Sequence, residues 1–218
     1  MVSESTTALI QTCLSSNVLL FGSFTLKSGR NSPYFFNAGL LYSGSQLATL
    51  ATCFAQAIID SGLEFDVLFG PAYKGIALAA ITAVELHRLS GRSVDFAYNR
   101  KEAKTHGEGG SLVGAPMKGK RVMILDDVIT AGTAIREAIG LIKQEGGQLV
   151  GITESLDRQE RGKEKKESAV QEIERETGVP VLAVMTLKDI IGFLEGKPEM
   201  KDHLEAMQKC ESCTPAVT

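Results

Sequence analysis

Residues 122–134 read VMILDDVITAGTA, and no other stretch of the chain is as informative. Four apolar residues, Val122 to Leu125, are bounded by charge on both sides, a pattern typical of a central parallel strand that is covered on both faces. Two acids follow, Asp126 and Asp127, and adjacent carboxylates at the end of a buried strand are costly unless they hold something. The stretch therefore predicts a strand that ends at a functional site.

The turn after the acid pair has the composition of an anion site. Residues 130–133 are small or carry hydroxyl groups, and residues 134–145 have helical composition. Unpaired N–H groups at a helix N-terminus attract anions, most often phosphate. The segment is predicted to bind a hydroxylated, phosphorylated molecule, with the acid pair at the hydroxyl groups and the helix N-terminus at the phosphate.

Strands and helices are predicted to alternate along the chain. Helices are expected over Glu4–Leu14, Gln46–Ile59, Ile76–Leu89, Ala134–Glu145 and Glu167–Thr177, and strands over Val18–Leu26, Tyr34–Asn37, Val67–Phe69, Val94–Tyr98, Val122–Leu125, Gln148–Leu156 and Val181–Thr186. This alternation predicts an α/β fold, a mostly parallel sheet with helices on both faces and ligands at the carboxyl ends of the strands. Residues 99–120 lack an apolar period and contain five glycines, which is typical of a functional loop or an insert.

Composition limits the classes of protein that fit. The 218 residues suit one domain, since no long polar linker divides them, and 23 basic against 26 acidic residues leave a net charge of −3. That balance gives no support for a nucleic-acid partner. No apolar run is long enough for a membrane span, and the scattered cysteines, of which only Cys210 and Cys213 form a C-x-x-C pair, indicate reduced thiols in a cytoplasmic protein.

Two other phosphate-binding motifs fit less well. Residues 114–120, GAPMKGK, match the first part of a Walker A motif, but Arg121 stands where Ser or Thr should bind magnesium, and the segment leads into a strand. No G-x-G-x-x-G follows a predicted strand. A nucleotide hydrolase and a dehydrogenase are both disfavoured.

Residues 122–134 resemble the phosphoribosyl-diphosphate (PRPP) signature of the type I phosphoribosyltransferases. Four further segments resemble the orotate phosphoribosyltransferases within that family: residues 24–37, residues 70–75, residues 98–109 and the pair Asp157-Arg158. The resemblance extends from about residue 4 to about residue 194. It implies the type I fold as one domain over residues 1–218, with a small hood from residues 1–40, a catalytic loop over residues 100–116 and a polar tail over residues 200–218.

The resemblance also implies the reaction and its parts. Orotate N1 would displace diphosphate from C1 of PRPP and give orotidine 5′-phosphate, a step of pyrimidine (UMP) biosynthesis. Mg²⁺ would be carried by PRPP, with no metal ligand from the protein. The enzyme would be a homodimer in which loop 100–116 acts in the partner's site, with neither nucleic acid nor membrane as a partner.

Site residues follow from the same resemblance. Catalysis is expected from Lys101, Lys104, His106, Asp126 and Asp127. PRPP is expected to contact Lys27, Tyr73, Lys74, Arg100, Lys101, Lys104, His106, Asp126, Asp127, Val128, Ile129, Thr130, Ala131, Gly132, Thr133 and Ala134. Orotate is expected to contact Lys27, Phe35, Phe36, Thr130 and Arg158, and a cis peptide bond is expected near Ala72-Tyr73.

Simpler interpretations exist for several of these residues. Without the family, Lys27 would be a solvated turn residue, Phe35 and Phe36 would be core, and His106 would be an exposed loop residue. Two other functions also stay open: transfer to a purine or to uracil, and a PRPP-sensing regulator without catalysis. Arg158 argues against a neutral base, because a guanidinium suits a planar carboxylate. The lysine and histidine loop argues against a sensor, which would not need it.

Overall fold

The computed structural model describes residues 2–25, 31–102, 111–160 and 167–210. Its centre is a six-stranded sheet in the order β5-β4-β3-β6-β7-β8, and only β5 runs antiparallel to its neighbour. The strands are β3 (Val67–Gly70), β4 (Asp95–Asn99), β5 (Leu112–Gly114), β6 (Arg121–Asp126), β7 (Gln148–Asp157) and β8 (Val181–Thr186). The predicted mostly parallel sheet is confirmed.

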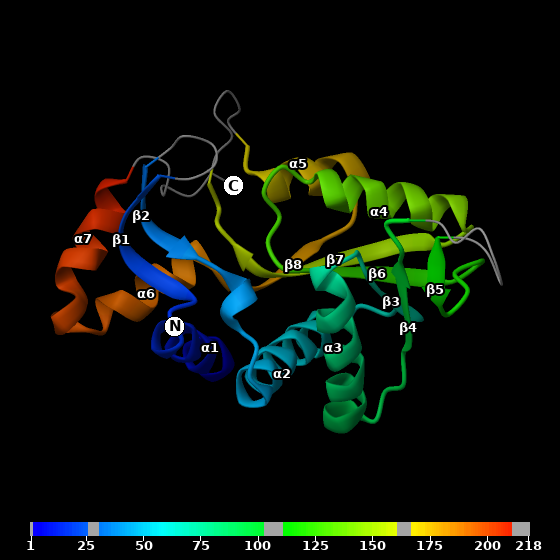
Figure 1. The fold of residues 1–218 in the computed structure, drawn as a ribbon, viewed down its shortest axis with the longest axis horizontal. Helices are drawn as coiled ribbons and strands as arrows, with labels where there is room; N and C mark the ends of the chain where they lie inside the picture. Colours follow the sequence, from blue (N-terminus) through cyan, green and yellow to red (C-terminus); the bar gives the residue numbers. More distant parts are fainter. Residues whose placement is uncertain (1, 26–30, 103–110, 161–166, 211–218) are drawn as a thin grey trace.

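Helices cover both faces of this sheet (Figure 1). On one face lie α2 (Gly44–Ser61) and α3 (Lys74–Ser90), and on the other lie α4 (Thr133–Gln144) and α5 (Ala169–Thr177). The central strand β6 serves both layers, because Met123 and Leu125 belong to one hydrophobic cluster while Val122 and Ile124 belong to the other. Side chains alternate across a strand, so a continuous apolar run is what a strand buried on both faces requires.

A second, two-stranded antiparallel sheet is formed by β1 (Leu19–Thr25) and β2 (Asn31–Phe36). It follows α1 (Glu4–Ser15) and lies beside the carboxyl ends of the main sheet's strands. The short helix η1 (Ala38–Leu40) leads from it into α2.

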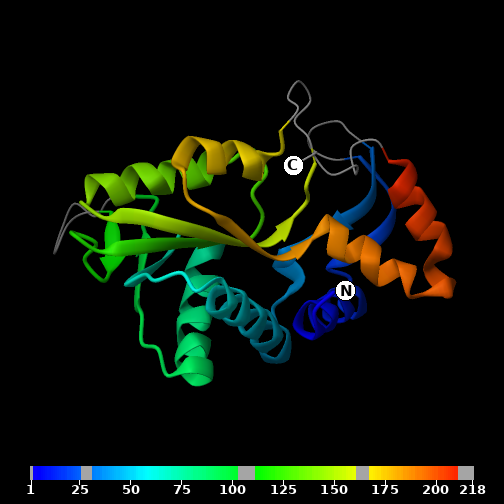
Figure 2. The same cartoon turned by 180° about the vertical axis from the view of Figure 1, so that it is seen from behind.

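The C-terminal region contains more structure than the sequence predicts. After β8 come α6 (Leu187–Glu195), η2 (Pro198–Met200) and α7 (Lys201–Lys209). The α7 helix packs against the β1-β2 sheet (Figure 2), where the ring of His203 stacks on Phe21 at 5.0 Å and Met207 is buried. Residues 200–218 are predicted as a polar tail, and residues 201–209 of it form the helix α7, which the sequence did not predict and which supports the small sheet.

A similar correction applies to residues 99–120. Three residues there form β5, which pairs with β4 through Ala97, Tyr98 and Asn99.

Among the described residues, no helix is long and apolar enough to cross a membrane. The thiols of Cys13 and Cys53 are free and buried.

The order of the strands locates a ligand site. From β3 the chain passes through α3 to β4 on one side, and from β6 it passes through α4 to β7 on the other. The connections thus diverge between the neighbours β3 and β6. In open α/β sheets such a switch point opens a crevice at the carboxyl ends of the strands.

Candidate active site

The start of α3 packs directly on the end of β6 at this switch point. A Cβ atom added to Gly75 would lie 2.8 Å from the carbonyl oxygen of Leu125, and one added to Gly70 would lie 2.1 Å from the carbonyl oxygen of Gly75. Both distances are shorter than real Cβ contacts. Glycine alone permits such an approach, so Gly70 allows the turn after β3 to close tightly and Gly75 allows α3 to begin beside the end of β6.

Asp126 and Asp127 lie at the end of β6, as predicted. The Asp127 N–H donates to Asp126 Oδ1 over 2.9 Å. Burial raises the pKa of Asp126 from its ordinary value of 3.8 to about 6, although this hydrogen bond opposes the shift. The Asp127 carboxylate forms an ion pair with the ammonium group of Lys74, which comes from the turn after β3 and has a side chain that is 58% exposed. The acid pair and a cation therefore meet at one edge of the sheet.

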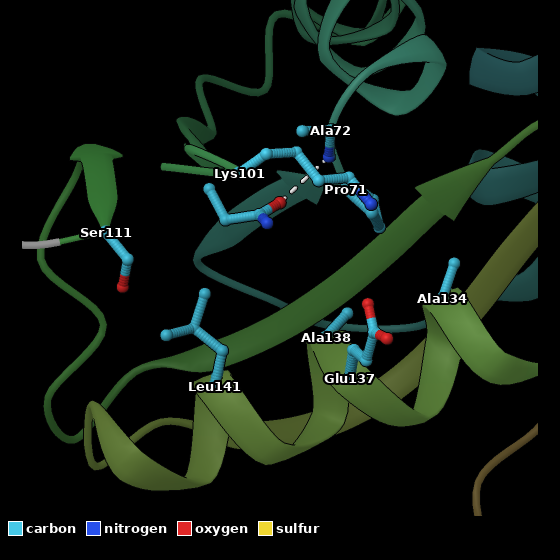
Figure 3. Close-up of a pocket in the computed structure, with 9 residues that line it drawn as sticks. Pro71, Ala72, Lys101, Ser111, Ala134, Glu137, Ala138 and Leu141 are labelled. Atoms are coloured by element: carbon cyan, nitrogen blue, oxygen red, sulfur yellow. Dashed lines mark hydrogen bonds between the residues drawn. The ribbon is translucent and has the colours of Figure 1, made fainter. Parts of the chain in front are cut away.

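The turn after β3 contains the predicted cis peptide bond, between Ala72 and Tyr73. The Ala72 N–H donates to Oδ1 of Asn99 over 2.8 Å, the dashed line in Figure 3. Asn99 ends β4, the strand next to β3. Sequence reasoning missed Asn99, because nothing local shows a contact with a residue 27 positions away.

Residues 130–134 form an open rim around the start of α4. Thr130, Ala131, Thr133 and Ala134 are exposed, whereas Gly132 is buried with φ at +73°, a left-handed conformation that favours glycine. Within the described part of the chain, no side-chain hydrogen bond caps the N-terminus of α4. Its first N–H groups are therefore the ones that the sequence predicts to meet an anion.

Arg136 holds this rim from inside α4. Its Nη1 donates to the carbonyl oxygen of Ala131 over 2.8 Å, while its Nε and Nη2 donate to the carboxylate of Glu176 in α5 over 2.8 and 3.0 Å. One loop carbonyl is thus turned toward the helix. The sequence did not single out Arg136, because its orientation depends on the contact with Glu176, which lies 40 residues further along the chain.

Val128 and Ile129 face the interior. Val128 packs against the first core cluster, and Ile129 is buried in the second. The Ile129 N–H donates to Oε2 of Glu154 over 2.6 Å. These two residues shape the loop from below, and Glu154 was also missed by sequence reasoning.

A cavity of about 160 Å³ lies between the β3 turn and α4 (Figure 3). Its wall contains Lys101, which follows β4, and Glu137 of α4. The preceding Arg100 is half-buried, and its N–H donates to the carbonyl oxygen of Ser111 over 2.7 Å. The remaining wall is made by Pro71, Ala72, Asn99, Ser111, Ala134, Ala138 and Leu141.

Arg158 follows β7 and is the cation of the expected orotate end. Its guanidinium lies 4.8 Å from the ring centroid of Tyr34, and its Nη2 and Nε donate to Glu160 Oε1 over 2.7 and 3.2 Å. The side chains of Arg158 and Glu160 are only 16% and 13% exposed. Tyr34 and Glu160 are additions to the predicted site. Tyr34 could have been found, because alternation along β2 places it on the face opposite Phe35.

Phe35 is exposed and its ring lies 5.6 Å from that of Phe24, whereas Phe36 packs against the first core cluster. The two predicted aromatic contacts therefore occupy different environments. Lys27, Lys104 and His106, all predicted site residues, lie outside the described residues.

Comparisons with known proteins agree with this architecture. The phosphoribosyl transferase domain family matches residues 39–183. The chain is 57% identical over 199 residues to the orotate phosphoribosyltransferase of Klebsiella pneumoniae (strain 342), which covers 91% of this chain and 92% of that protein. Identity to the orotate phosphoribosyltransferase of Serratia proteamaculans (strain 568) is 58% over the same coverage.

A solved structure gives the same result. The orotate phosphoribosyltransferase of Francisella tularensis is 42% identical, with a TM-score of 0.85 over 93% of this chain and 96% of that one. The chain belongs to the type I phosphoribosyltransferases. Within that family it groups with the orotate phosphoribosyltransferases.

Proposed function

We propose that this chain transfers the 5-phosphoribosyl group from PRPP to N1 of orotate and releases diphosphate. The observation that carries the proposal is the meeting of the β3 and β6 turns at the switch point, with an acid pair, a cation and an uncapped helix N-terminus in one place. The identity to named orotate phosphoribosyltransferases over nine-tenths of the chain supports the choice of base.

The β6 turn would hold the ribose 5-phosphate. Asp126 and Asp127 would accept hydrogen bonds from the ribose hydroxyls, and their negative charge would stabilise a sugar that becomes cationic as diphosphate leaves. The N–H groups of residues 130–134, with the Thr130 and Thr133 hydroxyls, would bind the 5′-phosphate.

Cations would hold the diphosphate. Lys74 at the start of α3, with Arg100 and Lys101 after β4, would surround the diphosphate beside Tyr73, and Lys27, Lys104 and His106 are proposed to join them. Mg²⁺ would arrive bound to PRPP and neutralise part of the leaving group's charge. Within the described residues, no group of three or more His, Cys, Asp or Glu side chains could hold a metal ion.

Lys74 has a further part in this proposal. Before substrate arrives, it neutralises Asp127. A diphosphate carries more negative charge than one carboxylate, so it would draw Lys74 away and free Asp127 for the ribose hydroxyls. Binding of the two halves of PRPP would thereby be linked.

Arg158 would pair with the orotate carboxylate. Phe35, Phe36, Lys27 and Thr130 would border the ring, beneath the small β1-β2 sheet, which would serve as the hood. Uracil and the purines carry no carboxylate, so they would offer this guanidinium no anionic partner beyond Glu160.

The second copy of a homodimer would pack on α3. Its outward face presents Tyr73, Ala77 and Val84, and the Tyr73 and Val84 side chains are 73% and 71% exposed. These positions share one face of the helix, and Tyr73 begins it beside the site. Loop 100–116 of each subunit would then reach the active site of its partner. The protein is proposed to act in the cytoplasm. Sedimentation at assay concentrations tests this proposal, and a fully active monomer would contradict it.

The reaction is tested with purified protein, Mg²⁺, PRPP and orotate, following the loss of orotate absorbance. Uracil and hypoxanthine serve as matched alternative bases. We expect turnover with orotate alone. Turnover with another base but not with orotate would refute the assignment of the base, and tight PRPP binding without turnover on any base would favour a regulator.

A further inference from the structure

Glu154 is a fully buried acid next to the acid pair. It lies on β7 at 0% exposure, and its register partner on β6 is Asp126. Registered residues of neighbouring parallel strands point to the same face of a sheet. The side chain therefore lies beneath the β6 turn.

Glu154 and its neighbour hold two successive parts of that turn. Its Oε2 accepts from the Ile129 N–H over 2.6 Å, and the N–H of Ser155 donates to the carbonyl oxygen of Asp127 over 2.8 Å. Residues 127–129 are thus tied to β7. Beyond Ile129 the chain turns outward to the exposed residues Thr130 and Ala131.

The chemistry of this carboxyl group is unusual. Its Oε1 has no hydrogen-bond partner among the described residues. Burial raises the pKa of Glu154 well above its ordinary value, against the Ile129 hydrogen bond, and the charges of Asp157, Asp126 and Asp127 raise it further. A neutral carboxyl group still accepts through one oxygen, and it adds no negative charge beneath a loop that would receive a phosphate.

We propose that Glu154 is a positioning residue for PRPP, which holds the Ile129 N–H inward so that the following N–H groups of the loop face the 5′-phosphate. Glu154 itself does not touch the substrate. This inference rests on the proposed function, since it assigns that loop to the ribose 5-phosphate.

A purely structural role would have a different signature. If Glu154 only filled space in the sheet, its replacement would affect orotate and PRPP alike, or stability alone. If it holds the phosphate loop, the KM for PRPP should change while kcat and the KM for orotate do not. A glutamine at position 154, which is isosteric and keeps an acceptor oxygen, should then keep the KM for PRPP close to that of the natural enzyme.

The test compares Glu154→Met with Glu154→Gln in the full-length enzyme. Methionine has a similar size but no comparable acceptor, so we expect the KM for PRPP to rise about tenfold, the effect of leaving one buried N–H unpaired, with kcat and the KM for orotate within about twofold. Glutamine should keep the KM for PRPP within about threefold. Thr153→Val is the matched control, because it removes a buried hydroxyl of the same strand that has no partner among the described residues, and it should change none of these values.

Equal rises in both KM values, or a methionine variant that matches the natural enzyme, would overturn the proposal. Residue-resolved amide hydrogen exchange on the natural protein gives a second test that needs no variant. The Ile129 amide should exchange at least a hundredfold more slowly than those of Thr130 and Ala131, and comparable rates would overturn the anchor. Exchange does not require turnover, so a protein without activity would refute the proposed function and leave this test intact.

Discussion

The loop after β6 and the segment after β7 leave the same edge of the sheet, yet they are built to recognise ligands in different ways. The β6 loop offers backbone N–H groups, and two of its other polar groups are already occupied: the Ile129 N–H by Glu154 and the Ala131 carbonyl by Arg136. The β7 segment offers the side chain of Arg158, which already pairs with Glu160. Under the proposed function, the β6 loop is prepared for the 5′-phosphate, whereas Arg158 in the β7 segment already pairs with a carboxylate, the same group through which orotate would bind.

The two regions are therefore expected to differ in the free energy of reorganisation that ligand binding costs. Fixed backbone donors need little reorganisation when a phosphate arrives. An arginine that is bound to an internal carboxylate must share or exchange that partner before it can bind another. We therefore expect changes near β6 to act on PRPP and changes near β7 to act on orotate.

The largest effect is expected from Asp126→Asn, which would lower kcat/KM for PRPP by about 10²- to 10³-fold, because a charge that stabilises the cationic sugar is lost. The same change should stabilise the protein at pH 7. The pKa of Asp126 is raised from 3.8 to about 6 in the folded state. A raised pKa favours folding below pH 3.8, and this contribution is lost as pH rises through 6.

At pH 7 the buried charge therefore costs on the order of 2 kcal/mol, which the asparagine removes. Urea unfolding of both proteins at pH 7 and at pH 4 measures this, and the gain should nearly vanish at pH 4. A gain of equal size at both values would show that charge is not its cause. Asp127→Asn is the comparison variant, since Asp127 already has Lys74 as a partner.

Arg158→Leu tests the β7 region. Loss of a charge-assisted hydrogen bond costs about 1.5–3 kcal/mol, so the KM for orotate should rise about 10- to 100-fold while the KM for PRPP stays within about twofold. Arg158→Lys should recover only part of the loss, because an ammonium cannot reproduce the planar fork. Steady-state kinetics with each substrate varied in turn measures both constants. A matching rise for PRPP would erase the distinction between the two regions.

Arg136→Met tests the second anchor of the β6 loop. The Ala131 carbonyl would lose its donor, and we expect the KM for PRPP to rise about fivefold with no change for orotate. Arg175→Met is the matched control, because Arg175 lies on the neighbouring helix α5 and pairs with Glu167, which precedes that helix, and among the described residues it makes no hydrogen bond to the loop. If both variants behave alike, the effect comes from lost charge and not from the anchor.

These regions also differ in how far the sequence predicts them. The apolar run of β6 and the composition of the turn after it are local signals, so the strand, the acid pair and the open helix N-terminus follow from a few consecutive residues. The anchors do not, since Glu154 meets Ile129 across 25 residues and Arg136 meets Glu176 across 40. Nothing near either position in the sequence indicates its partner.

The missed elements have the same cause. The strand β5 has three residues and depends on its pairing with β4. The helix α7 buries only Met207 and depends on contacts with α6 and with the small sheet. Short elements carry too little periodicity to be distinguished from loops, whereas the long buried strands of the main sheet were predicted within one or two residues of their ends.

Glu160→Gln should give the smallest effect and decides whether Glu160 competes with orotate. Glu160 Oε1 accepts from both Nη2 and Nε of Arg158. An orotate carboxylate would approach the same guanidinium, and two carboxylates at close range repel each other. A glutamine keeps the acceptor oxygen but removes the charge, so the KM for orotate should fall about two- to threefold while the KM for PRPP and kcat stay unchanged. Glu167→Gln, at an exposed arginine pair, is the control. A rise in the KM for orotate would instead mean that Glu160 holds Arg158 in its binding position, and the β7 segment would then be as well prepared for its ligand as the β6 loop.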